Sequence, residues 1–391
     1  MLKARAGSKA LIREINEALI LDIVRSRGPV ARAQIAVATG LSAATVTGIT
    51  GKLLRNGFLV ETDIRNGTGG RPARLLELGT DTVFAAGVRL SSTEAYAALV
   101  DLRGTVVGTH REKLKSSDPA DVRSSIVRAV QKVAGPRSIS SLLGLGIALS
   151  GVVDQKSGHV RHSGSLGWED VPLQAELQGT VAIPVVVDSY ANSFGMGLLL
   201  FEDKLEGRDL LVFSVGTSLG ASVIVQGRIH RGFNGSAGGF AHSRTSDATD
   251  RALPCHCGAT NCLETRASWW GIQQELSEGI FPDKSAALAD AALHLGTAMA
   301  NVAKIFGPER VVLATAPEVD GPELAQQTAE IYREQYRHEK TPAPELEATT
   351  ADNNSVAKGA AYMVLAQIFT ANTSEAYASA DLLELAVAQQ G

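Results

Sequence analysis

All three cysteines of the chain lie within eight consecutive positions, at Cys255, Cys257 and Cys262, and a histidine, His242, lies upstream of them. Two cysteines two positions apart, a glycine turn at Gly258 and a third cysteine can fold around one ion. Zinc prefers four nitrogen or sulfur ligands in a tetrahedron, and His242 can supply the fourth. The spacing therefore predicts a zinc site, and the alternative is a loop with three free thiols.

The composition narrows the class of protein. A hydrophobic content of 45% over 391 residues predicts two or three domains with well-formed cores. Three cysteines are too few for a secreted disulfide scaffold. The first nine residues are charged and lack the apolar segment of a signal peptide, and the longest apolar runs, such as 142–153, are too short or interrupted to span a bilayer. We therefore expect a cytoplasmic protein without a membrane partner.

Positive charge is concentrated in the N-terminal part of the chain. Residues 1–74 hold 12 Lys and Arg against 5 Asp and Glu, a net charge of +7, so a whole-chain charge of −4 leaves −11 for residues 75–391. A basic head on an acidic body is typical of a fused nucleic-acid-binding module. A basic surface that is merely solvated would give the same charge count. The interpretation as a nucleic-acid-binding module therefore depends on the local sequence pattern as well.

The local pattern in the basic head predicts a helix-turn-helix. Apolar residues recur at helical spacing over residues 15–24, and residues 31–39 predict a second, short helix. Gly40 stands where a tight turn between two helices needs a positive φ angle. Ser42 can cap a third helix, over residues 43–53, whose first half exposes only small or hydroxylic side chains. Such a helix suits close approach in a major groove.

A β-ribbon is predicted after the third helix, from strands near residues 58–60 and 75–78 with a tip at 65–72 that contains Gly-Arg-Pro. A narrow, basic tip suits a minor groove. We therefore predict a winged helix that binds a double-stranded DNA operator as a homodimer or homotetramer; the alternative is a winged helix that contacts only proteins. The side chains expected at the DNA are Arg32, Ser42, Ala44, Thr45, Thr47 and Arg71.

From about residue 81, strands and helices alternate, which predicts an α/β architecture of two lobes with a cleft between them. Strands are predicted over residues 83–90, 95–101, 142–149, 181–187, 210–215, 221–225 and 309–314, and helices over 118–133, 191–200, 286–306 and 355–369. We expect a DNA-binding domain over residues 1–80 and a second domain over 81–391. Its first lobe would cover about 81–187 plus the C-terminal helix, and its second lobe about 188–368.

The winged helix, the run Gly-Ser-Ala-Gly-Gly-Phe-Ala-His at 235–242 and the cysteine loop together resemble the ROK family of repressors, open reading frames and kinases, over essentially the whole chain. The resemblance implies the actin-like, ribonuclease-H-like fold of sugar kinases and a cleft that binds a sugar. It also implies a structural zinc held by His242, Cys255, Cys257 and Cys262. The family's kinases use ATP, and its repressors carry the extra winged helix and usually release DNA on binding a sugar or sugar phosphate.

The chain departs from the kinases of this family where they hold phosphate. Their Asp-x-Gly-Gly-Thr is Arg-Leu-Ser-Ser-Thr here, at residues 89–93, and the second phosphate turn, at 216–219, lacks an expected glycine. Their catalytic Asn-Asp pair aligns with Ser189 and Tyr190. A tyrosine with an ordinary pKa near 10 cannot replace a carboxylate as general base. We therefore predict that the domain is not an enzyme; the alternative is an active ATP-dependent sugar kinase.

The sugar site implied by the resemblance is changed at four positions and kept at three. Its residues here are Ser165, Ser189, Tyr190, Asn192, Gly239, His242 and Glu264, of which Asn192, His242 and Glu264 keep the family's residue. A pocket that has lost a carboxylate and two amides no longer matches a standard hexose. We therefore expect a different small-molecule effector, a sugar or sugar derivative. The alternative is a regulator that needs no ligand.

Overall fold

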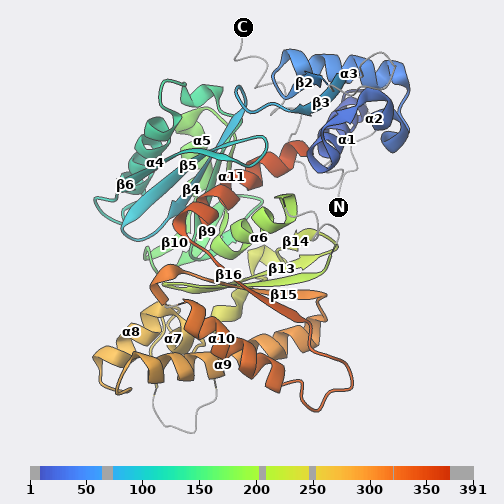
Figure 1. The fold of residues 1–391 in the computed structure, drawn as a ribbon. Coiled ribbons are helices and arrows are strands. Elements are labelled where there is room, and N and C mark those ends of the chain that lie inside the picture. The colour runs from blue at the N-terminus through green and yellow to red at the C-terminus, as the bar shows by residue number, and fades with distance from the viewer. Residues whose placement is uncertain (1–8, 64–73, 202–207, 246–251, 320, 370–391) are drawn as a thin grey trace.

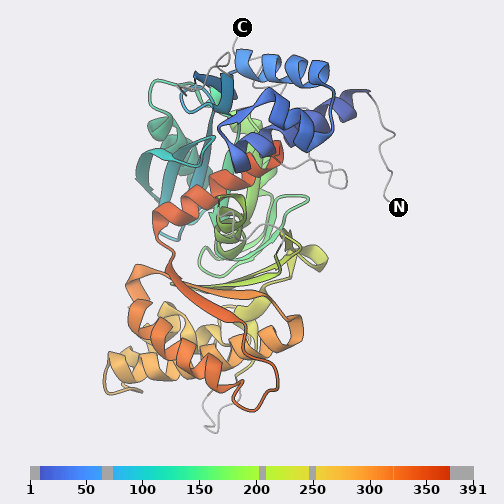
Figure 2. The same cartoon turned by 45° about the vertical axis from the view of Figure 1, so that its right-hand side comes forward.

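A computed structural model describes residues 9–63, 74–201, 208–245, 252–319 and 321–369. These residues form an N-terminal winged helix that lies beside the first of two α/β lobes, with the second lobe at the opposite end of the molecule (Figures 1 and 2). The predicted wing tip, residues 65–72 with Arg71, lies outside the described residues.

The winged helix has the elements that the sequence predicts. Its described elements are α1 (Lys9–Arg27), β1 (Val30–Ala31), α2 (Arg32–Thr39), α3 (Ala43–Arg55), β2 (Leu59–Asp63) and β3 (Arg74–Leu78), with the strands in the order β1-β3-β2. Gly40 ends α2 with a φ of +70°, and the Ser42 hydroxyl accepts a hydrogen bond from the Thr45 amide at 3.1 Å to cap α3. The two helices meet at a bend of 118°, as a helix-turn-helix requires.

The first lobe is built on a five-stranded sheet in the order β11-β7-β4-β5-β6. The strands are β4 (Phe84–Leu90), β5 (Glu94–Asp101), β6 (Val106–Lys113), β7 (Leu145–Leu149) and β11 (Val185–Ser189). One face packs on α4 (Pro119–Ala134) and α5 (Leu173–Val181), and the other packs on α11 (Asn353–Phe369). Because successive strand residues point to opposite faces, the apolar runs of β4 and β5 supply both cores.

Two glycines let α11 approach this sheet closely. A Cβ atom on Gly87 of β4 would lie 1.9 Å from the carbonyl oxygen of Ala357, and one on Gly146 of β7 would lie 1.8 Å from that of Ala360. No side chain fits there, so glycine is needed for space and not for backbone freedom. The C-terminal helix is thereby fixed to the first lobe, as both views show (Figures 1 and 2).

The second lobe repeats this plan with a sheet in the order β14-β13-β12-β15-β16. Its strands are β12 (Leu210–Val215), β13 (Leu219–Val225), β14 (Arg228–His230), β15 (Arg310–Thr315) and β16 (Glu345–Thr350). One face is covered by α7 (Glu264–Ala267), α8 (Trp269–Ser277), α9 (Lys284–Phe306) and α10 (Gly321–Glu334). The other face packs on α6 (Tyr190–Phe201), which thus lies between the second sheet and α11.

Both sheets have three parallel strands followed by two antiparallel ones. The lobes therefore share one topology, and the cleft between them lies where the strands of each sheet end. A small sheet in the order β10-β9-β8 borders the cleft in the first lobe. Its strands are β8 (Val152–Asp154), β9 (His159–Ser163) and β10 (Trp168–Val171).

The winged helix is packed directly on the lobes. Residues of α1, including Ile20 and Leu21, share one buried apolar cluster with α11. Arg25 at the end of α1 donates a hydrogen bond to the carbonyl of Leu200 in α6, and its guanidinium lies 5.8 Å from the Phe369 ring centroid. Arg103, after β5, pairs with Glu77 of β3. Apolar and polar contacts thus hold the two parts together.

No single described helix is long and apolar enough to cross a membrane; the bent pair α2 and α3 passes that test jointly, by length and composition only.

Candidate functional site

The cysteine loop folds back on itself so that its thiols converge. The Cys255 amide donates to the carbonyl of Ala259 at 2.8 Å, and Gly258, with a φ of +80°, makes the tight turn between them. The Asn261 side chain accepts from the Leu253 amide at 2.8 Å and closes the base of the loop. Cys255 and Cys262 are buried, whereas Cys257 faces solvent.

The predicted zinc ligands come together. The ligand atoms of His242, Cys255, Cys257 and Cys262 all lie within 4.8 Å of one another. The sulfurs of Cys257 and Cys262 are 3.6 Å apart, and the Cys255 sulfur is 3.7 Å from His242 Nδ1. Zinc–sulfur bonds of about 2.3 Å place the corners of a tetrahedron roughly 3.8 Å apart, so these spacings fit one ion.

The protonation of His242 also suits a metal ligand. Burial lowers its pKa, and the nearby His162 and His256 oppose its positive charge. The imidazole is therefore neutral near pH 7, which is the form that binds a metal. His242 ends the short helix Gly239–His242, which follows Gly238 with a φ of +89°.

The cysteine loop also positions Glu264, the first residue of α7, two residues after Cys262. The Glu264 side chain is buried, accepts a hydrogen bond from the Leu219 amide at 3.0 Å, and has its pKa raised by burial to about 7. A buried ion pair between Arg266 and Glu275, 2.8 Å apart, holds α7 to α8. The cysteine loop before Glu264 and the ion pair after it thus fix the Glu264 side chain at the cleft.

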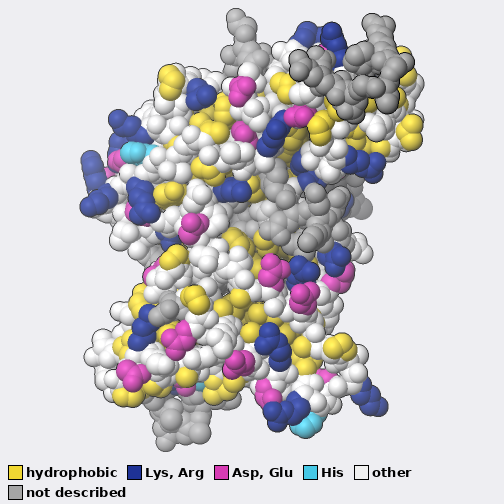
Figure 3. Space-filling model, in the orientation of Figure 1, with side chains coloured by type: hydrophobic (Ala, Val, Ile, Leu, Met, Phe, Trp, Pro, Cys, Tyr) yellow, Lys and Arg dark blue, Asp and Glu magenta, His cyan; other side chains and the backbone are white. Residues whose placement is uncertain are grey.

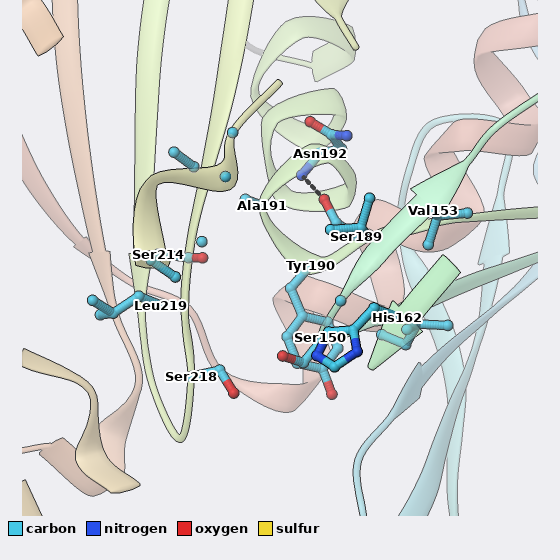
Figure 4. Close-up of a pocket in the computed structure, with 18 of the residues that line it drawn as sticks. Ser150, Val153, His162, Ser189, Tyr190, Ala191, Asn192, Ser214, Ser218 and Leu219 are labelled. Atoms are coloured by element: carbon cyan, nitrogen blue, oxygen red, sulfur yellow. Dashed lines mark hydrogen bonds between the residues drawn. The ribbon is translucent and has the colours of Figure 1, made fainter. Parts of the chain in front are cut away.

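All seven residues predicted to contact an effector line one pocket between the lobes: Ser165, Ser189, Tyr190, Asn192, Gly239, His242 and Glu264. Figure 4 shows Ser189, Tyr190 and Asn192 at the junction of β11 and α6, with Ser214, Ser218 and Leu219 facing them from the second sheet. The structure therefore brings the predicted set together, from four separate stretches of chain.

An ion pair that the sequence does not predict involves Asp188, which lines this pocket. Asp188, next to last in β11, is 2% exposed, and its Oδ2 lies 2.9 Å from Nη2 and 3.0 Å from Nε of Arg231, which follows β14 in the other lobe. Its Oδ1 accepts from the Asn192 side chain at 2.7 Å and from the Ser189 amide at 2.8 Å. Asp188 therefore orients two cleft residues and joins the lobes.

A second unpredicted residue of the pocket is His162 of β9, which Figure 4 shows projecting into the cleft beside Ser150. Its Nδ1 lies 2.6 Å from the Glu169 carboxylate, and its buried Nε2 has no hydrogen-bond partner in the described part of the chain. The alternation of β9 puts His162 on the cleft face, but a lone histidine gives no sequence signal for this.

A second compartment of the cleft lies beyond Tyr190 and is lined by Arg89, Ser91, Ser92, Ser150, Thr217, Ser218 and Glu318, among others. The Arg89 guanidinium lies 5.3 Å from the centroid of the Tyr190 ring. The Tyr190 hydroxyl donates to the carbonyl of Leu90, and burial raises its pKa. A phenol with a raised pKa and a committed proton does not act as a general base.

The predicted DNA-facing residues of α3 are accessible. Ser42, Ala44 and Thr47 are exposed, and Thr45 is half-buried. Arg32, by contrast, is already engaged, because it lies 2.7 Å from the Glu61 carboxylate and donates to Thr50 at 3.1 Å. Lys52 is likewise paired, with Glu17 at 2.9 Å, whereas Arg55 adds positive charge to the last turn of α3, and Figure 3 shows Lys and Arg side chains on this part of the surface.

Comparison with known proteins identifies the family of this chain. Residues 85–367 match the ROK family. The chain belongs to the ROK family. It is 25% identical over 399 residues to the xylose repressor of Caldicellulosiruptor bescii, with 93% of this chain and 98% of that protein covered.

Two solved ROK structures have the same fold. A ROK family transcriptional regulator, a homolog of Escherichia coli Mlc, has a TM-score of 0.74 at 20% identity and covers 97% of this chain and 100% of its own. A ROK family glucokinase from Streptomyces griseus in complex with glucose and AMPPNP has a TM-score of 0.63 at 21% identity and covers 72% of this chain and 98% of its own. The predicted fold class, a two-lobed kinase-like ROK domain, is confirmed.

Proposed function

We propose that this ROK protein is a DNA-binding transcriptional repressor whose kinase-like domain senses a small molecule and does not phosphorylate it. The observation that carries the proposal is the combination of a winged helix, packed on the lobes through α1, with Tyr190 at the position of the kinases' general base. The name of the xylose repressor and the coverage of the ROK regulator support it. The division into residues 1–80 and 81–391 is part of the same proposal.

The recognition element is α3, whose exposed first turns present small and hydroxylic side chains. These let the backbone approach base edges in a major groove, while Arg71 in the wing would contact the backbone or minor groove. A homodimer presents two such helices, so the operator is an inverted repeat with half-sites a whole number of helical turns apart. Arg32 would reach DNA only after leaving Glu61, so we assign it a supporting role.

Electrophoretic mobility shift tests the DNA interface, with DNA captured from the genome by the purified protein. Ala44→Glu places a negative charge on the exposed face of α3, and we expect it to abolish the shift by repelling phosphate. Ala120→Glu is the matched control, because Ala120 is an exposed helix residue in α4. Equal DNA binding by both variants, or a footprint of a monomer on one asymmetric half-site, would contradict this interface.

The inactive domain is tested against the kinase alternative. The position of the family's aspartate on the first phosphate turn is Arg89, and the oxygen of the neutral Tyr190 phenol is too weak a base to take the proton of a sugar hydroxyl. Loss of a general base costs about 10²–10⁴ in rate. We expect no sugar-dependent ATP consumption over a panel of aldoses, amino sugars and pentoses. Turnover with any of these that rises with protein concentration would favour the kinase.

Zinc would have a structural role, held by His242, Cys255, Cys257 and Cys262. Four protein ligands leave no open position for water, so the ion would fix the cysteine loop and, through it, Glu264. His242 would bind through Nδ1, which leaves Nε2 free to donate to an effector in the pocket.

Helix α6 provides a route from the cleft to the winged helix. Its first residues, Tyr190 and Asn192, line the pocket, and the carbonyl of Leu200 in its last turn accepts from Arg25 of α1. A helix moves as a unit, so a ligand-induced shift at its start is transmitted to α1. Arg25→Ala should weaken the response of operator binding to an effector more than operator binding itself. A regulator that ignores every metabolite tested would favour the ligand-independent alternative.

A further inference from the structure

The cleft continues past the sugar-like pocket into the compartment that begins at Tyr190. The two parts share the wall formed by Ser150, Ser165, Tyr190, Ser214 and Ser218, so one ligand can occupy both. The first part holds the acidic Glu264 and the imidazole of His242. The second holds a basic side chain, Arg89, and several hydroxyls. The two compartments therefore differ in charge.

Arg89 is held in place but has no acidic partner. Its guanidinium stacks on the Tyr190 ring, which is itself fixed through the hydroxyl to Leu90. In the described part of the chain Arg89 forms no ion pair, and it is half-buried. A stacked guanidinium keeps its N–H edge available in the plane of the group, which is the geometry that recognises carboxylate and phosphate. The ring thus positions the cation for a ligand.

The hydroxyls around Arg89 are also uncommitted. The side chains of Ser92, Ser150 and Thr217 make no hydrogen bond to the described residues, and each lines the compartment. Hydroxyls both donate and accept, so they can complete the coordination of an anion that Arg89 binds. One carboxylate, Glu318, lines the same compartment and forms no ion pair with Arg89 within the described chain. It disfavours an anion on its own side and so confines the anion to the side of Arg89.

The substitution at position 89 inverts the charge that ROK kinases carry there. A carboxylate holds phosphate only through a metal ion, whereas a guanidinium binds an anion directly. We propose that this compartment is an anion site, in which Arg89 and the hydroxyls of Ser92, Ser150 and Thr217 bind the carboxylate or phosphate group of the effector without Mg²⁺. The inference deepens the proposed function, because it rests on the cleft being the sensor of a repressor.

The full-length protein is titrated with inorganic phosphate in Mg²⁺-free buffer by calorimetry. We expect binding that Arg89→Gln weakens by about 10- to 100-fold, since a charge-assisted hydrogen bond is lost. The matched control is Arg111→Gln, because Arg111 also stacks on a tyrosine, 5.2 Å from the Tyr96 ring, but on the outer strand β6. Glu318→Gln should tighten phosphate binding, as it removes the opposing charge.

A second titration distinguishes a phosphate group from a carboxylate group on the ligand. The affinities for glucose 6-phosphate and for glucuronate are each compared with the affinity for glucose. We expect at least one acidic sugar to bind about tenfold tighter than glucose, with the difference lost in Arg89→Gln. Several results would overturn the inference: no phosphate binding, Mg²⁺-dependent binding, equal binding by Arg89→Gln and wild type, or no preference for either acid. If phosphate binds as expected but no operator is found, the anion site stands and the proposed function fails.

Discussion

Arg231→Met should destabilise the protein more than any comparable surface change, because it leaves the Asp188 carboxylate buried without its cation. Asp188 is 2% exposed, and Arg231 contacts it through two nitrogens, at 2.9 and 3.0 Å. Two neutral donors, Asn192 and the Ser189 amide, would remain. Removing one partner of a buried pair costs about 3–5 kcal/mol.

The expected cost here is smaller than that range. The Arg231 side chain is 22% exposed, so water can reach the space it leaves and solvate part of the charge. We therefore expect a loss of roughly 2–3 kcal/mol in the free energy of unfolding. In a domain of this size that corresponds to a fall of roughly 3–5 °C in the unfolding midpoint.

A double variant isolates the cause. Asp188→Asn with Arg231→Met has no buried charge, so it should be more stable than Arg231→Met alone. Arg161→Met is the matched control, because Arg161 also pairs with two carboxylates, those of Asp154 and Asp170, but on the surface, where such pairs contribute little. Differential scanning calorimetry measures all four proteins. A double variant as unstable as the single one, or Arg231→Met equal to Arg161→Met, would refute the argument.

Three further predictions follow from single contacts. Metal analysis should find about one zinc per chain, and Cys257→Ser should lose it and lower the unfolding midpoint of the second lobe. Gly146→Ala should cost about 1–3 kcal/mol by steric clash with the Ala360 carbonyl, whereas Gly179→Ala in α5, with nothing near its Cβ, should stabilise by about 0.5–1 kcal/mol in urea denaturation. Hydrogen bonds from Arg32 and then Arg74 hold the pKa of Glu61 below its ordinary value, so the ionised carboxylate stabilises the folded winged helix. This stabilisation is complete above the unfolded pKa of about 4.3 and disappears as the pH falls through the folded pKa. The winged helix of wild type should therefore lose stability to acid more steeply than that of Glu61→Gln, as followed by hydrogen exchange.

Features set by short spacings can be predicted from the sequence. The zinc ligands need only a turn at Gly258 and a nearby histidine, and the helix-turn-helix needs only Gly40 and Ser42 between two amphipathic helices. The main strands and long helices of both lobes also follow from continuous apolar runs. Strand β6 is not predicted, because its residues 109–113, Thr-His-Arg-Glu-Lys, are polar at the exposed edge of the sheet, and β16 and α10 are not predicted either.

Features set by the meeting of distant segments cannot be predicted in this way. Asp188 and Arg231 are 43 residues apart and belong to different sheets, so their contact depends on how the lobes dock. The stacking of Arg89 on Tyr190 depends on the parallel register of β4, β7 and β11, which brings the ends of β4 and β11 to one edge. Arg32 has the charge expected of a DNA contact, but the register of β2 places Glu61 beside it.

Under the proposed function, the changes that would remove kinase chemistry also suit the cleft to sensing. A ligand shifts an equilibrium between two lobe arrangements only by its difference in affinity for them, and each 1.4 kcal/mol of difference is about a factor of ten. Arg89 belongs to the first lobe, and His242 and Glu264 to the second, so a ligand with an acidic group and hydroxyls contacts both only when the lobes are close. A neutral sugar in the first part of the cleft lacks the contact to Arg89, so we expect it to discriminate less. Because α6 starts at this junction and its last turn contacts Arg25 of α1, we expect the acidic group to decide whether binding reaches the winged helix.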